Sequence, residues 1–148
     1  MAKFEIVVGS MLGASEYVAD ALQESLQKHH HSASIHQEAQ AADLATDAIW
    51  LICSSTHGAG DLPDNIQPFA EQLSQHDLSG IKFIVIGLGD SSYDTFCYAA
   101  KTLERQLLSA GADLLQPPLH IDVLNHPIPE DVAVAWLEEL LMSDAFSD

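Results

Sequence analysis

The amino-acid sequence predicts an α/β protein whose parallel sheet carries helices on both faces. Short, near-continuous apolar runs alternate along the chain with segments whose apolar residues repeat at helical spacing. Strands that are apolar throughout, rather than at every second residue, are typical of parallel sheets covered on both sides. The 148 residues, 47% of them apolar, are enough for one domain spanning 1–148 with a sizeable core.

The individual elements follow in chain order. Strands are expected at residues 4–8, 34–36 (a weak pattern), 48–53, 81–86 and 119–123. Four helices are expected. The first contains the repeat Val18, Leu22 and Leu26, and the second spans residues 66–75. The third contains the repeat Leu103, Leu107 and Ala110 and ends at Gly111, and the fourth contains the repeat Val132, Trp136 and Leu140, with Pro129 and Glu130 in its first turn.

The composition excludes several classes of partner. Twenty-two acidic residues against five basic ones give a net charge of −17, which disfavours nucleic acid and anionic membranes as partners. The charge favours a basic macromolecular partner, or serves only to keep the protein in solution. No apolar run is long enough to span a membrane, and the first residues do not resemble a signal peptide. Cys53 and Cys97 are expected to be buried thiols in a reducing cytoplasm rather than a disulfide.

Three loops rich in Gly and Ser follow the predicted strands. They are GSMLGAS at 9–15, SSTHGAGDLPDN at 54–65 and GLGDSSYDTFC at 87–97. Parallel α/β sheets bind ligands just beyond the carboxyl ends of their strands, where these loops are expected to meet. The sequence therefore predicts a ligand site at that edge of the sheet.

The first loop enters a helix, where backbone N–H groups and the helix dipole favour an anion. It has neither the lysine of a Walker loop nor the glycine spacing of a dinucleotide fingerprint. None of the five basic residues lies in the three loops, so a phosphate would be held by neutral donors. An ordinary turn between strand and helix is the alternative. The candidate residues are Ser10, Met11, Leu12, Gly13, Ala14 and Ser15.

The second and third loops suit a planar ring system. Thr56, His57 and the small residues 58–60 offer a polar side chain, a flat ring and close backbone approach. Without a catalytic triad around it, His57 is interpreted as a packing group. Tyr93 is placed to stack on a planar ligand with its hydroxyl in water, whereas Phe96 is expected in the core.

The triple His29, His30 and His31 suggests a metal site at first. Neighbouring helical residues point about 100° apart, so three of them do not readily share one ion. A basic helix C-terminus, favoured by the macrodipole, is the alternative interpretation.

On these motifs, with the late stretch IDVLNHPIPED, the chain resembles the flavodoxin superfamily over its whole length, and within it the MioC group of small flavodoxin-like proteins. The resemblance implies one non-covalent FMN and a five-stranded sheet of order 2-1-3-4-5. It implies that residues 10–15 bind the phosphate, that 56–60 cradle the isoalloxazine and that Asp122 lies near the ring edge. The cofactor-binding residues implied for the later loops are Ser55, Thr56, His57, Gly58, Ala59, Gly60, Gly89, Asp90, Tyr93, Phe96 and Cys97.

The function implied is one-electron transfer rather than stand-alone catalysis. Electrons are expected to arrive from a separate NAD(P)H-linked flavin reductase with a basic docking surface and to leave to an acceptor redox enzyme, for which the resemblance points to biotin synthase. A monomer in the cytoplasm is expected. The alternatives are an FMN-dependent reductase of small substrates and a flavin-free regulatory module. Leu12 and Ser15 stand where flavodoxins usually carry Thr, so weakened phosphate binding is expected.

Overall fold

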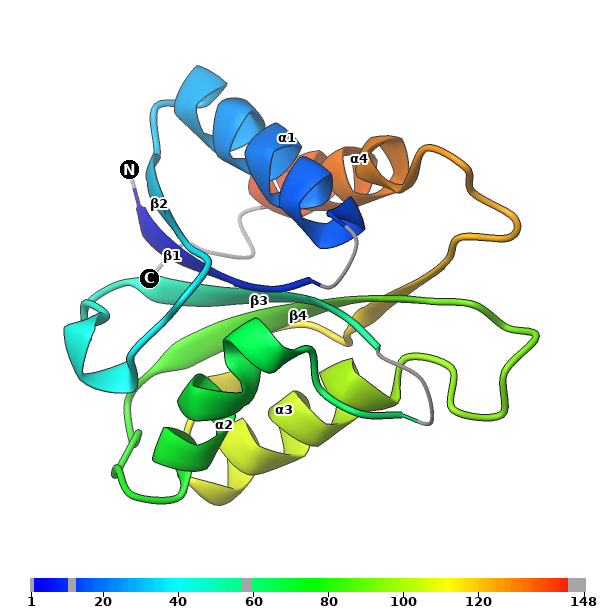
Figure 1. The fold of residues 1–148 in the computed structure, drawn as a ribbon. Coiled ribbons are helices and arrows are strands. Elements are labelled where there is room, and N and C mark those ends of the chain that lie inside the picture. Colours follow the sequence, from blue (N-terminus) through cyan, green and yellow to red (C-terminus); the bar gives the residue numbers. More distant parts are fainter. Residues whose placement is uncertain (1, 11–12, 57–59, 144–148) are drawn as a thin grey trace.

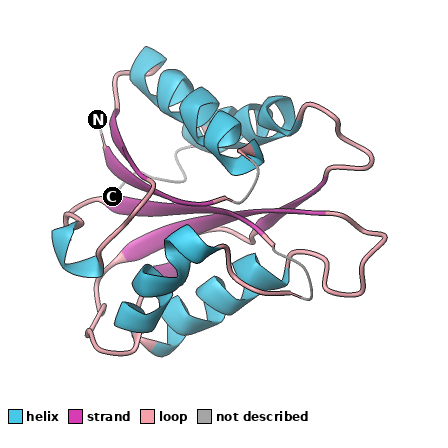
Figure 2. Cartoon of the chain, viewed as in Figure 1, coloured by secondary structure: helices cyan, strands magenta, loops and turns pink. Residues whose placement is uncertain are grey.

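The computed structural model describes residues 2–10, 13–56 and 60–143. Strands and helices alternate along most of the chain, except that only a short 3₁₀ turn separates the second strand from the third and that the sixth strand directly follows the fifth (Figures 1 and 2). The strands are β1 (Lys3–Gly9), β2 (Ser32–His36), β3 (Ile49–Ser55), β4 (Lys82–Gly89), β5 (Asp113–Leu114) and β6 (Leu119–Asp122). The helices are α1 (Ala14–Lys28), α2 (Gln67–Leu73), α3 (Tyr98–Ser109) and α4 (Pro129–Met142), with short 3₁₀ turns η1 (Ala41–Asp43) and η2 (Asp64–Ile66).

The strands form one parallel sheet in the order β2-β1-β3-β4-β5, and β6 also pairs with β4. This confirms the predicted order, with one addition. The fifth position is shared by two short strands, of which only β6 was predicted. Pro117 and Pro118 lie between them, and because proline has no backbone N–H, they interrupt the pairing that a single longer strand would make.

Helices cover both faces of the sheet, as the apolar strand pattern predicts. Helices α1 and α4 lie on one face, and α2 and α3 lie on the other (Figure 1). In β1, Phe4 and Ile6 contribute to the core beneath α1 and α4, whereas Val7 contributes to the core on the opposite face. Two apolar cores, one on each face, therefore hold the four helices against the sheet.

The helix spacing in the sequence matches the buried faces of α1 and α3. Val18, Leu22 and Leu26 of α1 are fully buried, as are Leu103 and Leu107 of α3. In α4 the fully buried apolar residues are instead Ala133 and Leu137, and the expected Val132, Trp136 and Leu140 are only partly buried. None of the helices in the described residues is long and apolar enough to cross a membrane.

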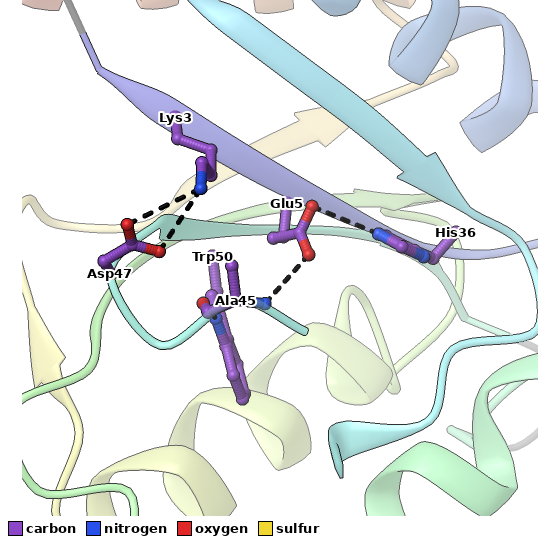
Figure 3. A network of polar contacts seen from close by, with 6 residues as sticks. All are labelled: Lys3, Glu5, His36, Ala45, Asp47 and Trp50. Carbon is purple, nitrogen blue, oxygen red and sulfur yellow. Dashed lines mark hydrogen bonds and ion pairs between the residues drawn. The ribbon is translucent and has the colours of Figure 1, made fainter. Parts of the chain in front are cut away.

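One carboxylate breaks the apolar pattern of β1. The Glu5 side chain is only 9% exposed, and its Oε1 lies 3.3 Å from Nε2 of His36 in β2. The other oxygen, Oε2, accepts a hydrogen bond of 3.0 Å from the backbone N–H of Ala45, whose carbonyl accepts a bond of 3.0 Å from the Trp50 indole (Figure 3). Glu5 therefore connects β1 both to the edge strand β2 and to the segment that leads into β3.

Candidate functional site

The three predicted loops meet at one end of the sheet. Strands β1, β3, β4 and β6 run parallel, so the segments that follow them emerge at the same edge (right-hand side of Figure 1). Of the residues predicted there, Met11, Leu12, His57, Gly58 and Ala59 lie outside the described residues, and their roles stay predictions.

The first loop is held at both ends by hydrogen bonds. The backbone N–H of Ser10 donates to Oδ1 of Asn65 at 3.0 Å, and the Ser10 hydroxyl accepts from the backbone N–H of Gly13 at 2.9 Å. Gly13 has a φ of 91°, in the left-handed region that other residues enter only with strain. This conformation turns the chain into α1, which begins at Ala14.

The beginning of α1 offers donors for an anion. Its N-cap is Gly13, which has no side chain to cap the helix, so the backbone N–H groups of the first turn lack the usual side-chain acceptor. Ser15 behaves differently from the expected phosphate donor. It is fully buried, and its Oγ lies 2.6 Å from Oγ of Ser55 at the end of β3. Its hydroxyl links the first loop to the second, and a contact with phosphate stays a prediction.

The described parts of the second loop lie against the start of α3. The Thr56 hydroxyl accepts a hydrogen bond of 3.1 Å from the backbone N–H of Ala99. Gly60 lies so close to Tyr98 that a Cβ added to the glycine would be 3.1 Å from a carbon of the tyrosine ring. Both ends of the loop are therefore fixed relative to α3.

The third loop presents an uncovered aromatic side chain. Asp90 Oδ1 accepts hydrogen bonds from the backbone N–H of Ser92 at 2.8 Å and from its hydroxyl at 2.6 Å. The backbone N–H of Tyr93 donates to the Asp90 carbonyl at 3.1 Å, which closes a turn. Tyr93 is 61% exposed, so its ring is available to a planar ligand.

The end of the third loop folds back onto β4. A Cβ added to Gly89 would lie 2.8 Å from the backbone N of Cys97 and 2.9 Å from a ring carbon of Phe96. Cys97 is fully buried, which raises the pKa of its thiol to about 12. Phe96 is partly buried, with its ring edge-on to His120 at a centroid distance of 6.3 Å. Both residues pack the loop, and their contact with a ligand stays a prediction.

Both cysteines are buried free thiols, as the sequence predicts. Cys53 is fully buried in β3, and burial raises the pKa of its thiol to about 12 as well. The histidine triple lies past the end of α1, where His31 Nδ1 accepts from the backbone N–H of Ala2 at 2.8 Å and His29 faces Glu138 at 3.5 Å. No group of three or more His, Cys, Asp or Glu side chains in the described residues is arranged to hold a metal ion.

Asp122 connects the third loop to the end of β6. Its Oδ1 accepts hydrogen bonds from the backbone N–H of Ser91 at 3.2 Å and of Leu124 at 3.0 Å. A hydrogen bond from the Ser91 side chain contributes most to lowering the pKa of Asp122 from its ordinary value of 3.8, and the backbone N–H groups of Leu124 and Ser91 add to it. Asp122 is therefore a negative charge fixed beside the loop that carries Tyr93.

Comparison with known proteins identifies the family of this chain. The flavodoxin family model matches residues 6–136. The chain belongs to the flavodoxin family. It is 45% identical over 139 residues to the protein MioC of Escherichia coli, with 93% of this chain and 95% of the relative covered. It is 34% identical over 143 residues to flavodoxin YqcA of the same species, covering 94% and 96%.

Solved structures agree with this membership. A cysteine-to-serine mutant of flavodoxin from Pseudomonas aeruginosa has a TM-score of 0.85 at 35% identity, with 93% of this chain and 95% of that chain covered. A flavodoxin from Streptococcus pneumoniae has a TM-score of 0.82 at 28% identity, covering 96% and 99%. Within the family the chain groups with the MioC proteins, which confirms the resemblance seen in the sequence.

Membership implies FMN as the cofactor and electron transfer, rather than stand-alone catalysis, as the activity. The described residues fit this flavin. The start of α1 offers uncapped N–H groups to a phosphate, and Tyr93 offers an exposed ring to the isoalloxazine. FMN, when bound, supplies the redox chemistry, since it exchanges electrons one at a time.

Sequence reasoning missed two residues of this edge, Asn65 and His120. Asn65 closes the motif SSTHGAGDLPDN, and its position beside the predicted loop was the available signal. His120 lies beneath the third loop, and its Nε2 is buried with no hydrogen-bond partner among the described residues. Burial, and then the nearby Lys101 ammonium, lower the pKa of His120 from its ordinary value of 6.5.

We expect His120 to make the flavodoxin fold sensitive to acid. In the unfolded chain the imidazole binds a proton near pH 6.5, whereas in the folded protein it does so only at lower pH. The stability associated with neutral His120 is therefore present above pH 6.5 and is lost as the pH falls towards the folded pKa. Urea unfolding at pH 7.5 and at pH 5 should show that the free energy of unfolding falls less between these two pH values in His120→Gln than in the parent. Equal losses in the two proteins would exclude this role.

Proposed function

We propose that this protein is a one-electron carrier between a separate NAD(P)H-linked flavin reductase, which docks through a basic surface, and an acceptor redox enzyme. Biotin synthase is the acceptor to which the MioC resemblance points. The observation that carries the proposal is the combination of a flavodoxin site with a net charge of −17. Such a charge accelerates encounter with basic partners and disfavours nucleic acid. Buried free thiols support a reducing compartment such as the cytoplasm, and we infer that the carrier acts as a monomer in it.

We propose that residues 10–15 bind the FMN phosphate, that residues 55–60 line the isoalloxazine and that Tyr93 stacks on its outer face. The remaining third-loop residues Gly89, Asp90, Phe96 and Cys97 shape the loop that presents Tyr93. In support, the first loop leads into an uncapped helix, and hydrogen bonds link each loop to a neighbouring segment. No Lys or Arg occurs in the three loops, so neutral donors hold the phosphate in this proposal.

Replacement of Tyr93 by Ala is expected to weaken FMN binding by about 1–2 kcal/mol, the value of an aromatic stack together with its buried area. The fold should be unchanged, because the side chain is 61% exposed. Tyr93→Phe is the matched control, since it keeps the ring and removes only the hydroxyl. Flavin fluorescence quenching gives both dissociation constants. A Tyr93→Ala protein that binds FMN as tightly as the parent would show that Tyr93 does not stack.

The proposed function predicts opposite salt dependences for two processes. Electron transfer from a reductase should slow as salt rises, because ions screen the attraction of a basic partner over about 8–10 Å. FMN binding should tighten modestly, because its phosphate approaches an acidic protein that has no Lys or Arg in the three loops. Stopped-flow reduction and fluorescence titration measure the two. If FMN affinity falls as salt rises, cationic side chains hold the phosphate, and the proposal that neutral donors hold it is wrong.

A further inference from the structure

Asn65 lies where three segments of the flavin-binding edge meet. Its Oδ1 accepts the hydrogen bond of 3.0 Å from the backbone N–H of Ser10. Its Nδ2 donates to the carbonyl of Val8 at 2.8 Å, at the end of β1, and to the carbonyl of Gln37 at 2.7 Å, just past β2. The one side-chain amide thus uses its acceptor and both of its donor hydrogens on backbone groups of other segments.

These contacts set the conformation in which the first loop begins. Asn65 fixes the backbone of Ser10, and the Ser10 hydroxyl in turn accepts the N–H of Gly13, from which α1 begins. A carboxylate has no N–H to donate, and a hydroxyl has only one hydrogen. Asparagine is therefore suited to this position, since it combines one acceptor with two donors on a short side chain.

We propose that Asn65 is a positioning residue for the phosphate of FMN. Asn65 follows the proposed ring-binding residues 55–60 in the chain, and its hydrogen bonds hold the start of the proposed phosphate loop, residues 10–15. It therefore fixes the position of the phosphate site relative to the ring site. This inference rests on the proposed assignment of residues 10–15 to the phosphate. It distinguishes Asn65 from a residue that only stabilises the fold, because its effect falls on one chemical part of the ligand.

The test compares FMN with riboflavin, which has the same ring system and no phosphate. In Asn65→Ala, FMN affinity should fall by about tenfold, the loss expected when partly buried backbone groups are left without their partner, whereas riboflavin affinity should hardly change. Asn65→Asp keeps an acceptor for Ser10 and loses both donors. It serves as a second variant in case Asn65→Ala does not fold, and its ratio of FMN to riboflavin affinity should also fall. Fluorescence quenching measures both ligands in each protein.

Gln67→Ala is the matched control. Its amide donates to the Leu62 carbonyl at 3.0 Å and contacts Asp64 at 3.4 Å, so its contacts stay within its own segment. The ratio of FMN to riboflavin affinity should not change in this variant. An equal loss of both ligands in the Asn65 variants, or an unchanged ratio, would overturn the positioning role.

Gly13→Ala separates this inference from the proposed function. Its φ of 91° strains any other residue, so the substitution perturbs the first loop directly. If Gly13→Ala lowers the ratio of FMN to riboflavin affinity and the Asn65 variants do not, the assignment of residues 10–15 to the phosphate is kept and only the role of Asn65 is wrong. If Gly13→Ala leaves the ratio unchanged, residues 10–15 do not bind the phosphate and the inference fails with that assignment.

Discussion

Replacement of Gly89 by Ala is expected to cost about 1–3 kcal/mol of folding stability through overpacking. FMN affinity should also fall by roughly tenfold, because the displaced loop must return to its parent conformation to bind the ligand. The added methyl group would lie 2.8 Å from the backbone N of Cys97 and 3.0 Å from its sulfur. A backbone atom cannot rotate away as a side chain can, so the loop that carries Tyr93 must shift. The dissociation constant for FMN and the urea midpoint measure the two consequences.

Gly80→Ala is the control for this substitution. An added methyl group there meets no atom within 4 Å, although the φ of 88° costs about 1–2 kcal/mol of folding stability. Gly80 follows α2 and precedes β4, at the opposite end of that strand from the three loops proposed to bind FMN. FMN affinity should therefore be unaffected in Gly80→Ala. Parent-like FMN binding by Gly89→Ala would show that the third loop tolerates displacement.

Glu5→Ala is expected to lower the free energy of unfolding by about 1–3 kcal/mol, because the partly buried N–H of Ala45 loses its acceptor. The His36 ring loses its partner at 3.3 Å in the same variant, and the edge strand β2 loses a connection to β1. Urea unfolding of the FMN-free protein measures the effect without a contribution from the ligand.

Glu5→Gln is the companion variant, because its amide oxygen can accept from Ala45 and its amide N–H can donate to a neutral His36 ring. We expect it to lose less than about 1 kcal/mol. Comparable losses in the two variants would mean that the negative charge, and not the hydrogen bonds, stabilises the segment before β3.

Local patterns in the sequence located β1, β2, β3, β4 and β6 and the helices α1 to α4, whereas the strand order came from the family resemblance. Val18, Leu22 and Leu26 recur at the spacing of one helix face, and all three are fully buried. The loops could be located because the carboxyl ends of parallel strands share one edge, whichever residues fill them. Tyr93 could be identified because it is an aromatic residue within a polar turn, and it is exposed in the structure.

Contacts between distant segments could not be predicted in this way. Asn65 and Ser10 lie 55 residues apart in sequence, and no periodicity connects them. Glu5 interrupts an apolar run, but its partners His36 and Ala45 lie 31 and 40 residues away. Strand β5 has two residues, too few for any pattern to show. Ser15 was expected to face a ligand, and only the folded chain shows that its hydroxyl meets Ser55.

The divided edge of the sheet has a consequence for self-association. An exposed strand recruits a strand from another molecule when it offers an unbroken row of backbone donors and acceptors. Here β5 and β6 contribute only Asp113–Leu114 and Leu119–Asp122, and Pro117 and Pro118 between them supply no N–H groups. This edge therefore offers no long unbroken row of backbone groups for pairing with a strand of another molecule. For a carrier that meets one partner after another, such an edge disfavours self-association through the sheet.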